Sequence, residues 1–318
     1  MAEERVSGIH HVTAISSDPQ RTLDFYTEVM GLRLVKLTVN FDDPGTYHFY
    51  FGDQVGSPGT ILTFFPWPRV PRGQIGTGQV TAIAFDMPAA SLEFWLARMH
   101  DHGVHMGDVE DRFGQEVVRL EAPDGLPLEL VAVPHAPNRP IAASNAVAAE
   151  HALRGFHSAT LSERDSAATE RLIELMGFTK VAEAVDRIRY QGGAHDASII
   201  DIVGEPKTAA GDLGAGIVHH IAFRTPTDDA QERWRRELMP HVRGITPVIN
   251  RVYFHSIYFR EPGGVLFEIA TDPPGFETDE TVDHLGERLM LPPWLEPSRD
   301  DLERRLPPLN RRTSPVTR

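Results

Sequence analysis

Short apolar runs rich in β-branched and aromatic residues recur along the chain, and segments with helical spacing follow some of them. In residues 7–66, a strand pattern at His11–Ser16 precedes a helix pattern that opens at Asp18-Pro19 and closes at Gly31. Asp18 suits the N-cap, Pro19 the first helical position and Gly31 a left-handed C-cap. Three more strand patterns follow, at Leu32–Val39, Tyr47–Gly52 and Thr60–Phe65. The segment is therefore predicted to form one strand, one helix and three strands.

The same order of elements recurs in residues 78–134, 154–205 and 216–272. Met30-Gly31-Leu32 and Met176-Gly177-Phe178 repeat one helix exit, and similar Pro-Asp-Gly and Pro-Gly-Gly turns precede the last strands of the second and fourth segments. The chain is therefore predicted to contain four βαβββ modules. Because one module has too few strands to close a sheet, pairs of modules must share a curved sheet around a cavity. The predicted fold class is α+β, with two curved mixed β-sheet half-barrels and helices outside.

The length of the chain also predicts more than one unit, because 318 residues exceed what one hydrophobic core usually serves. We expect a first domain at 1–135 with modules 1 and 2, and a second at 153–272 with modules 3 and 4. Residues 136–152, rich in Ala, Pro and Asn, are the expected linker. Residues 273–318 are expected to form a tail that packs on the core, with a short helix at Ser298–Leu306.

Composition and charge exclude several classes of partner. The net charge is −14 without a basic block, which argues against nucleic acid or an anionic membrane. The sequence has no apolar run long enough for a membrane helix, and its polar first residues lack the apolar core of a signal peptide. Cysteine is absent, so disulfides and thiolate metal sites are excluded, and a cytoplasmic location is expected. These patterns leave a homo-oligomer open.

Two histidine pairs stand in corresponding strands of modules 1 and 4. The first module opens with Gly8-Ile9-His10-His11 and the fourth with Gly216-Ile217-Val218-His219-His220. Successive side chains of a strand point to opposite faces, so one histidine of each pair can face a site while its neighbour faces away. Two such strands side by side would offer two imidazoles to one metal ion.

Glu268 is the candidate for a third ligand. It lies in an otherwise apolar strand, where an ionised carboxylate without a partner would be costly. Two histidines and one carboxylate on one face are characteristic of non-haem Fe(II) oxygenases, which keep the opposite positions open for substrate and O2. The residues favour His220 and Glu268. They leave His11 and His157 as alternatives, because His157 opens module 3 as His11 opens module 1.

The motifs also resemble a known family. The modules look like those of the vicinal oxygen chelate superfamily, which includes glyoxalase I, bleomycin-resistance proteins and extradiol dioxygenases. A closer resemblance is to the hydroquinone-type ring-cleaving dioxygenases, and it is carried by Gly8–His11, Val29–Lys36, Asp43–His48 and Leu291–Pro297. This resemblance favours His11 over His157 as the first ligand. It also implies that module 1 pairs with module 4 and module 2 with module 3.

The resemblance implies a function as well. The expected activity is that of an Fe(II)-dependent extradiol-type dioxygenase that inserts O2, its co-substrate, into a small aromatic diol, a hydroquinone or catechol; Mn(II) is the alternative metal. Five polar residues would stand beside the metal and substrate: His10, Thr13, His219, Arg251 and Tyr258. A neighbouring imidazole could take a phenolic proton, and Arg251 and Tyr258 could stabilise negative charge on bound oxygen.

Two rival functions are compatible with the same fold. A glyoxalase-type lyase or isomerase usually needs a fourth protein ligand, expected near Thr63-Phe64, where no ligand-type side chain stands. A non-catalytic binding protein of the bleomycin-resistance kind need not keep the metal ligands. Outside the ligand set, His48 is interpreted as an ordinary strand residue. Phe65 and Trp67 are interpreted either as core residues or as lining of the cavity mouth.

Overall fold

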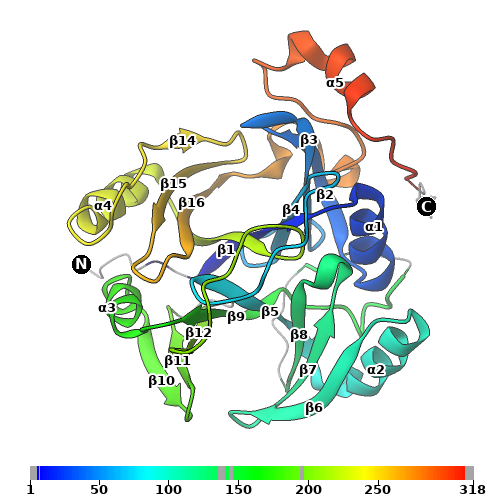
Figure 1. The fold of residues 1–318 in the computed structure, drawn as a ribbon. Coiled ribbons are helices and arrows are strands. Elements are labelled where there is room, and N and C mark those ends of the chain that lie inside the picture. Colours follow the sequence, from blue (N-terminus) through cyan, green and yellow to red (C-terminus); the bar gives the residue numbers. More distant parts are fainter. Residues whose placement is uncertain (1–5, 7, 135–139, 143–145, 194–196, 312–318) are drawn as a thin grey trace.

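The computed structural model describes residues 6, 8–134, 140–142, 146–193 and 197–311, which form two curved eight-stranded sheets (Figure 1). The predicted polar N-terminus, much of the predicted linker and the end of the tail lie outside the described residues. In spatial order the first sheet contains β14 (Ile249–Asn250), β15 (Phe254–Arg260), β16 (Leu266–Pro274), β13 (Val218–Thr225), β1 (Ile9–Ser16), β4 (Ile61–Pro66), β3 (Asp43–Gly52) and β2 (Arg33–Asn40). The second contains β10 (Thr179–Glu183), β11 (Arg187–Gln191), β12 (Ile199–Gly204), β9 (Phe156–Glu163), β5 (Gln79–Pro88), β8 (Pro127–Val133), β7 (Gln115–Glu121) and β6 (Met106–Arg112).

The two orders confirm the predicted pairing of modules. Modules 1 and 4 join through β1 and β13, which run antiparallel, and modules 2 and 3 join through β5 and β9 in the same way. Within each module the first strand is parallel to the last, so both sheets are mixed. Each sheet therefore draws strands from both halves of the sequence.

The helices cover the outer side of the strands, as the predicted half-barrels require (Figure 1). They are α1 (Pro19–Asp24), α2 (Leu92–Asp101), α3 (Ala167–Leu175) and α4 (Asp228–Leu238), with α5 (Arg299–Arg305) in the tail. Asp18 caps α1 by accepting from the Arg21 amide, and Pro19 occupies the first turn. The predicted helix changes to a π-helical turn at Phe25–Val29 before Gly31 adopts a left-handed conformation at φ 70°. None of the described helices is both long and apolar enough to cross a membrane.

The βαβββ repeat predicts a second strand in modules 2 and 3, but no local pattern located β6 and β10, and both are polar sheet edges. In β6 all residues but the first and last are exposed, and β10 is exposed except for one residue. A strand without a buried face lacks the alternation of apolar and polar residues that predicts strands. Edge strands with charged side chains are common because they resist pairing with other chains.

The described part of the tail packs on module 1. Leu289 bridges to Leu37 on β2, and the Met290 amide donates to the Leu37 carbonyl. Lys36, whose side chain is fully buried, reaches Asp279 and Glu280 of the tail at 2.5 and 2.6 Å. These two ion pairs neutralise a buried ammonium group, which would otherwise be costly.

Candidate metal centre

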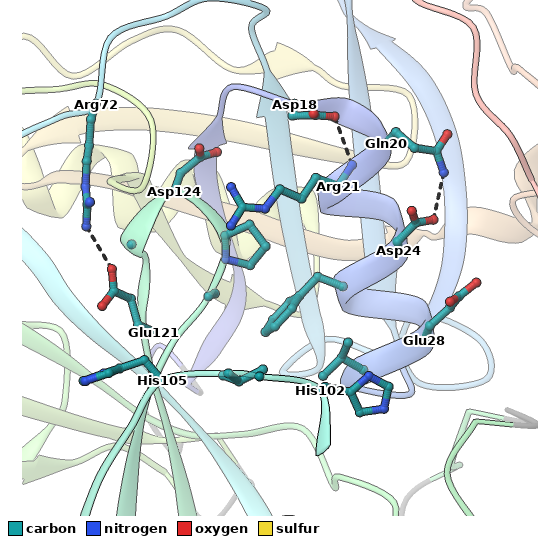
Figure 2. Close-up of a pocket in the computed structure, with 17 residues that line it drawn as sticks. Asp18, Gln20, Arg21, Asp24, Glu28, Arg72, His102, His105, Glu121 and Asp124 are labelled. Carbon is teal, nitrogen blue, oxygen red and sulfur yellow. Dashed lines mark hydrogen bonds and ion pairs between the residues drawn. The ribbon is translucent and has the colours of Figure 1, made fainter. Parts of the chain in front are cut away.

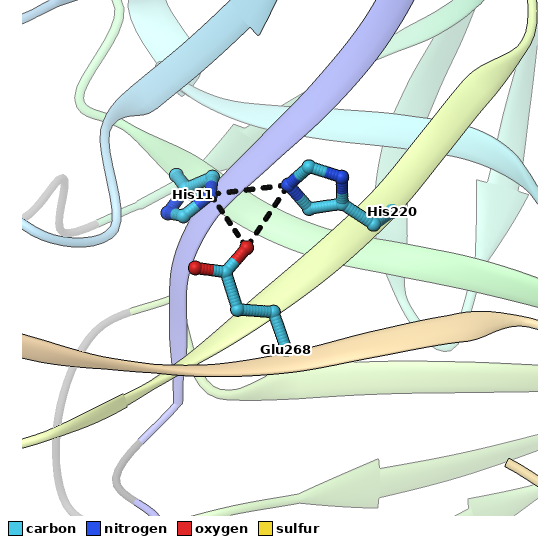
Figure 3. Close-up of side chains that lie close together, drawn as sticks. All are labelled: His11, His220 and Glu268. Carbon is cyan, nitrogen blue, oxygen red and sulfur yellow. Dashed lines mark hydrogen bonds and ion pairs between the residues drawn. The ribbon is translucent and has the colours of Figure 1, made fainter. Parts of the chain in front are cut away.

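Three neighbouring strands of the first sheet bring His11, His220 and Glu268 together. On β1, His11 stands opposite Ala222 of β13, which in turn stands opposite Glu268 of β16. His220 precedes Ala222 by two residues and therefore shares its face of the sheet. Figure 3 shows the three side chains converging from these strands. The sheet register thus brings His11 beside His220 and Glu268, whereas the alternative, His157, lies on β9 in the other sheet.

The three donor atoms lie at the separations expected around one ion. Nε2 of His11 and Nε2 of His220 are 3.2 and 3.0 Å from Oε2 of Glu268 and 3.4 Å from each other. Two donor atoms about 2.1 Å from a shared ion and at right angles to one another are roughly 3.0 Å apart. The three residues are buried. Among the described residues, they are the group of histidine and acidic side chains whose donor atoms lie close enough together to hold one metal ion. This donor set fits a single divalent metal ion.

The unfilled hydrogen-bonding capacity of Glu268 supports the same conclusion. Its Oε1 accepts from the Ser256 hydroxyl, while the fully buried Oε2 has no hydrogen-bond donor among the described residues. Burial alone would raise the pKa of Glu268, but the close imidazoles of His11 and His220 favour its charged form and hold the pKa well below its ordinary value. An ionised, buried oxygen that faces two imidazole nitrogens is satisfied when all three bind a cation.

The preceding histidine of each pair contacts the ligand histidine from behind. Nδ1 of His10 lies 2.9 Å from Nδ1 of His11, and Nδ1 of His219 lies 2.8 Å from Nδ1 of His220. A metal-binding histidine donates its second ring N–H to an acceptor, which fixes its tautomer and orientation. His10 and His219 can accept such bonds only when neutral. Burial lowers the pKa of His10 well below its ordinary value and that of His219 to about 3.

A cavity of about 360 Å³ opens beside the three ligands. It is lined by His11, Asn40, Phe41, Asp42, Asp43, His48, Tyr50, Phe65, Trp67, His219, His220, Arg251, Phe254, Tyr258 and Leu266. Phe65 and Trp67 therefore line the cavity, which was one of their two interpretations. The Trp67 indole also donates to Asp43 at 2.7 Å, which ties the start of β3 to the segment that follows β4.

Arg251 and Tyr258 lie together on the wall of this cavity. The Arg251 guanidinium donates to the Tyr258 hydroxyl at 3.2 Å and lies over its ring, and it pairs with Asp42 at 2.9 Å. Burial and the nearby Glu268 carboxylate raise the pKa of Tyr258 above its ordinary value, so the phenol remains protonated. The pair thus presents a cation and a neutral hydroxyl beside the ligand cluster.

Sequence reasoning missed two further residues of the cavity wall, His48 and Tyr50. His48 was interpreted as an ordinary strand residue, but its side chain shares the inner face of β3 with Tyr50 and lines the cavity. Nε2 of His48 lies 2.9 Å from the Thr63 hydroxyl, which donates to Thr13 at 2.8 Å. The spacing of the two residues, two apart on a strand, was the available signal for a shared face.

His157 lies in the second sheet, on β9, away from Glu268. Its Nδ1 is 3.0 Å from the Ser158 hydroxyl. Burial and the Arg189 charge lower its pKa to about 3. A histidine held neutral beside arginines on the other sheet is not part of the ligand cluster.

A second, more open cleft lies between α1 and the β7–β8 turn, with a volume of about 840 Å³ (Figure 2). Charged side chains line it: Arg72 pairs with Glu121 at 3.0 Å, and Asp18 accepts from the Arg21 amide. His102 and His105 are exposed on its wall.

Known proteins resemble this chain over most of its length. The model of the Glyoxalase/Bleomycin resistance protein/Dioxygenase superfamily matches residues 8–130 and 135–269. A Bacillus subtilis protein provisionally named ring-cleaving dioxygenase MhqO is 45% identical over 311 residues, covering 96% of this chain and 97% of its own. Chlorohydroquinone/hydroquinone 1,2-dioxygenase of Sphingobium indicum is 34% identical, covering 95% and 96%.

Solved structures show the same fold. A Bacillus subtilis crystal structure provisionally described as a dioxygenase superposes with a TM-score of 0.93 at 44% identity, covering 97% of this chain and 99% of that one. Glyoxalase I from Zea mays superposes with a TM-score of 0.61 at 16% identity, covering 84% and 92%. The second likeness concerns the fold alone.

Proposed function

Because the chain belongs to the Glyoxalase/Bleomycin resistance protein/Dioxygenase superfamily, we propose that it is an Fe(II)-dependent ring-cleaving dioxygenase that acts on a hydroquinone or a catechol. The observation that carries this proposal is the convergence of His11, His220 and Glu268 on one side of an aromatic-lined cavity. Relatives that cover nearly the whole chain bear names of ring-cleaving dioxygenases. We expect the protein in the cytoplasm, in keeping with its cysteine-free sequence.

The donor set supports iron. Two imidazole nitrogens and one carboxylate oxygen on a single face are typical of non-haem Fe(II) oxygenases, and Mn(II) accepts similar ligands. His11, His220 and Glu268 would hold an Fe(II) ion, which would supply the redox chemistry by which both atoms of O2 are incorporated into the ring-opened product. Side chains of the protein would contribute the binding and orientation of the diol.

Those side chains bind and orient the diol. Phe254, Phe65 and Trp67 supply aromatic surface to an aromatic ring and keep bulk water from the centre. Arg251 and Tyr258 can stabilise negative charge on a phenolate oxygen, because both are hydrogen-bond donors and one is a cation.

His219 is expected to donate a hydrogen bond to the substrate. Its Nδ1 accepts from His220, so in the neutral ring the second nitrogen carries the proton. This tautomer makes His219 a donor toward a substrate oxygen. It differs from the role as base that the sequence suggested for a neighbouring imidazole.

Oxygen uptake tests the proposal directly. Full-length protein loaded anaerobically with Fe(II) should consume O2 when methyl-hydroquinone or a catechol is added, and His220→Ala should abolish this uptake. His157→Gln is the matched control, because it alters a buried histidine in the other sheet and should leave uptake intact once folding is verified. Failure of the iron-loaded protein to take up O2 with any diol tested would refute the proposal.

Metal analysis separates the rival functions. Activity with Ni(II) or Zn(II) on a hemithioacetal, without O2 uptake, would favour a glyoxalase-type enzyme. Full ligand binding by metal-free protein would favour a binding protein. Among the described residues, the position expected for a fourth ligand holds Thr63, whose hydroxyl is engaged with His48 and Thr13.

A further inference from the structure

A row of polar side chains crosses the first sheet and ends beside the metal ligands. Tyr50 on β3 stands opposite Thr63 on β4, Thr63 opposite Thr13 on β1, and Thr13 opposite His220 on β13. Opposite residues of neighbouring strands present their side chains on one face. The row therefore connects the far wall of the cavity with a ligand histidine.

Hydrogen bonds run along this row from Tyr50 to Thr13, and His48 connects Tyr50 with Thr63. The Tyr50 hydroxyl lies 3.0 Å from Nδ1 of His48, and Nε2 of His48 lies 2.9 Å from the Thr63 hydroxyl. Thr63 donates to the Thr13 hydroxyl at 2.8 Å. The His48 ring is held between Tyr50 and Phe65, with ring centroids 4.1 and 4.4 Å away. Its orientation is therefore fixed by packing as well as by both ring nitrogens.

The hydroxyls of Tyr50, Thr63 and Thr13 and the neutral His48 ring carry one exchangeable proton each. The hydrogen bonds that join these four groups can therefore be donated in only two directions. If Tyr50 donates, the order is Tyr50 to His48 to Thr63 to Thr13, and the Thr13 proton is left over. If Thr13 donates, the Tyr50 proton is left over. Burial, with the charges of His11 and His220, lowers the pKa of His48 well below its ordinary value, so a neutral ring is expected.

The surroundings of Tyr50 decide between the two directions. Tyr50 is buried against the rings of Phe254 and Phe276, which offer no hydrogen-bond acceptor. Among the described residues, Nδ1 of His48 is the acceptor within reach of the Tyr50 hydroxyl. A buried phenol proton without an acceptor would cost about 1–3 kcal/mol.

We propose that Tyr50, His48 and Thr63 form a directed hydrogen-bond chain that holds the Thr13 hydroxyl as a donor toward the substrate side of the metal centre. His48 is then a positioning residue locked as the Nε2–H tautomer. Thr13 accepts from Thr63, so its own proton is free for a negatively charged oxygen beside His220. The role toward a substrate rests on the proposed dioxygenase function, whereas the direction of the chain does not.

The tautomer of His48 tests the direction without any activity measurement. We would record ¹⁵N NMR spectra of full-length, histidine-labelled protein loaded with diamagnetic Zn(II), in which protonated and unprotonated ring nitrogens differ widely in chemical shift. His48→Gln identifies the signals; if that variant does not fold, the signals that move in both Tyr50→Phe and Thr63→Val identify them. Protonation at Nε2 alone supports the chain, and protonation at Nδ1 or at both nitrogens overturns it.

Two variants test how the chain works. Tyr50→Phe removes the donor to Nδ1 and should convert the His48 signals to a mixture of both tautomers. Tyr47→Phe is the matched control, because Tyr47 donates to the Pro307 carbonyl of the tail and takes no part in the hydrogen-bond chain from Tyr50 to Thr13. An unchanged single tautomer in Tyr50→Phe would overturn the proposal.

A double-mutant cycle tests the function of the chain in the iron-loaded enzyme. Thr63→Val and Thr13→Val should each lower kcat/KM by roughly 3- to 10-fold, the size of one hydrogen bond, and the double variant should lose no more than either single one. Multiplying losses would overturn the coupling of Thr63 to Thr13. If no diol supports O2 uptake, the dioxygenase proposal fails, and the NMR result still decides the direction of the chain.

Discussion

Glu129 and Glu268 occupy the same register position in the two sheets. Glu268 stands opposite Ala222 on β13, and Glu129 stands opposite Ala84 on β5, the corresponding strand. The histidines have no counterparts, because Ser158 holds the place of His11 and Ala82 that of His220. In the second sheet the Arg112 guanidinium donates to both oxygens of Glu129, at 2.6 and 2.9 Å. An arginine thus neutralises the carboxylate that in the first sheet faces two imidazoles.

Removing this guanidinium should destabilise the protein strongly. Glu129 is 3% exposed and Arg112 9% exposed, so Arg112→Met would leave a buried carboxylate without its bidentate partner. We expect a loss of about 3–5 kcal/mol in the free energy of unfolding, measured by urea denaturation. Arg119→Met is the matched control: Arg119 also reaches Glu129, at 3.5 Å, but is 56% exposed and should matter far less. Equal losses in the two variants would contradict this account.

The metal centre should contribute to stability in a way that depends on His219. A metal that binds only the folded chain stabilises it by about 2.7 kcal/mol at 100 times its Kd, and a chelator should reverse this gain. Glu268→Gln should abolish the rise in Tm on adding metal.

His219→Ala keeps the three ligands but removes the acceptor for His220, so it should weaken metal binding roughly 10- to 100-fold, measured by titration calorimetry. Unchanged affinity in His219→Ala would show that the Nδ1 contact does not orient the ligand.

The sequence predicts those features of the fold that arise within short segments, and it predicts poorly those that depend on contacts between distant residues. The repeated helix exit at Gly31 and Gly177 and the alternating strands are local patterns, and they led to the four modules. The pairing of modules depends on contacts between residues about 200 positions apart, as between His11 and Ala222, and the residues alone left it open. Only the resemblance to a known family suggested it. His48 escaped notice because its role comes from Thr63 on the next strand, which no spacing along β3 reveals.

Stability should fall as the pH rises from about 5 to about 8, because of a buried carboxyl pair away from the metal centre. Glu163 is fully buried, and burial together with the neighbouring Glu261 raises its pKa from 4.5 to about 8. Glu261 accepts from the Thr169 hydroxyl and from the amides of Gly263 and Val265. The folded state therefore binds more protons than the unfolded state between these two pKa values.

The sign of the effect follows from that difference in bound protons. Stability from this pair is fully present below pH 4.5 and is lost as the pH rises through about 8, at up to about 1.4 kcal/mol per pH unit. Glu163→Gln, which keeps the shape without the charge, should flatten the profile measured by urea denaturation at several pH values. Glu116→Gln, at an exposed position, should leave the slope unchanged. Parallel profiles for wild type and Glu163→Gln would rule out this source of pH dependence.

The matching registers of the two sheets allow a test of what separates a metal centre from an ion pair. Ala82→His and Ser158→His would place two imidazoles where His220 and His11 stand in the first sheet, and Arg112→Ala would release Glu129. We expect the triple variant to bind two equivalents of Zn(II) per chain where the wild type binds one, as counted by elemental analysis after dialysis. The double variant that retains Arg112 should still bind one, because the guanidinium occupies both carboxylate oxygens and repels a cation. A folded triple variant that binds a single equivalent would mean that strand register alone does not bring the three ligands to the distances found around Glu268.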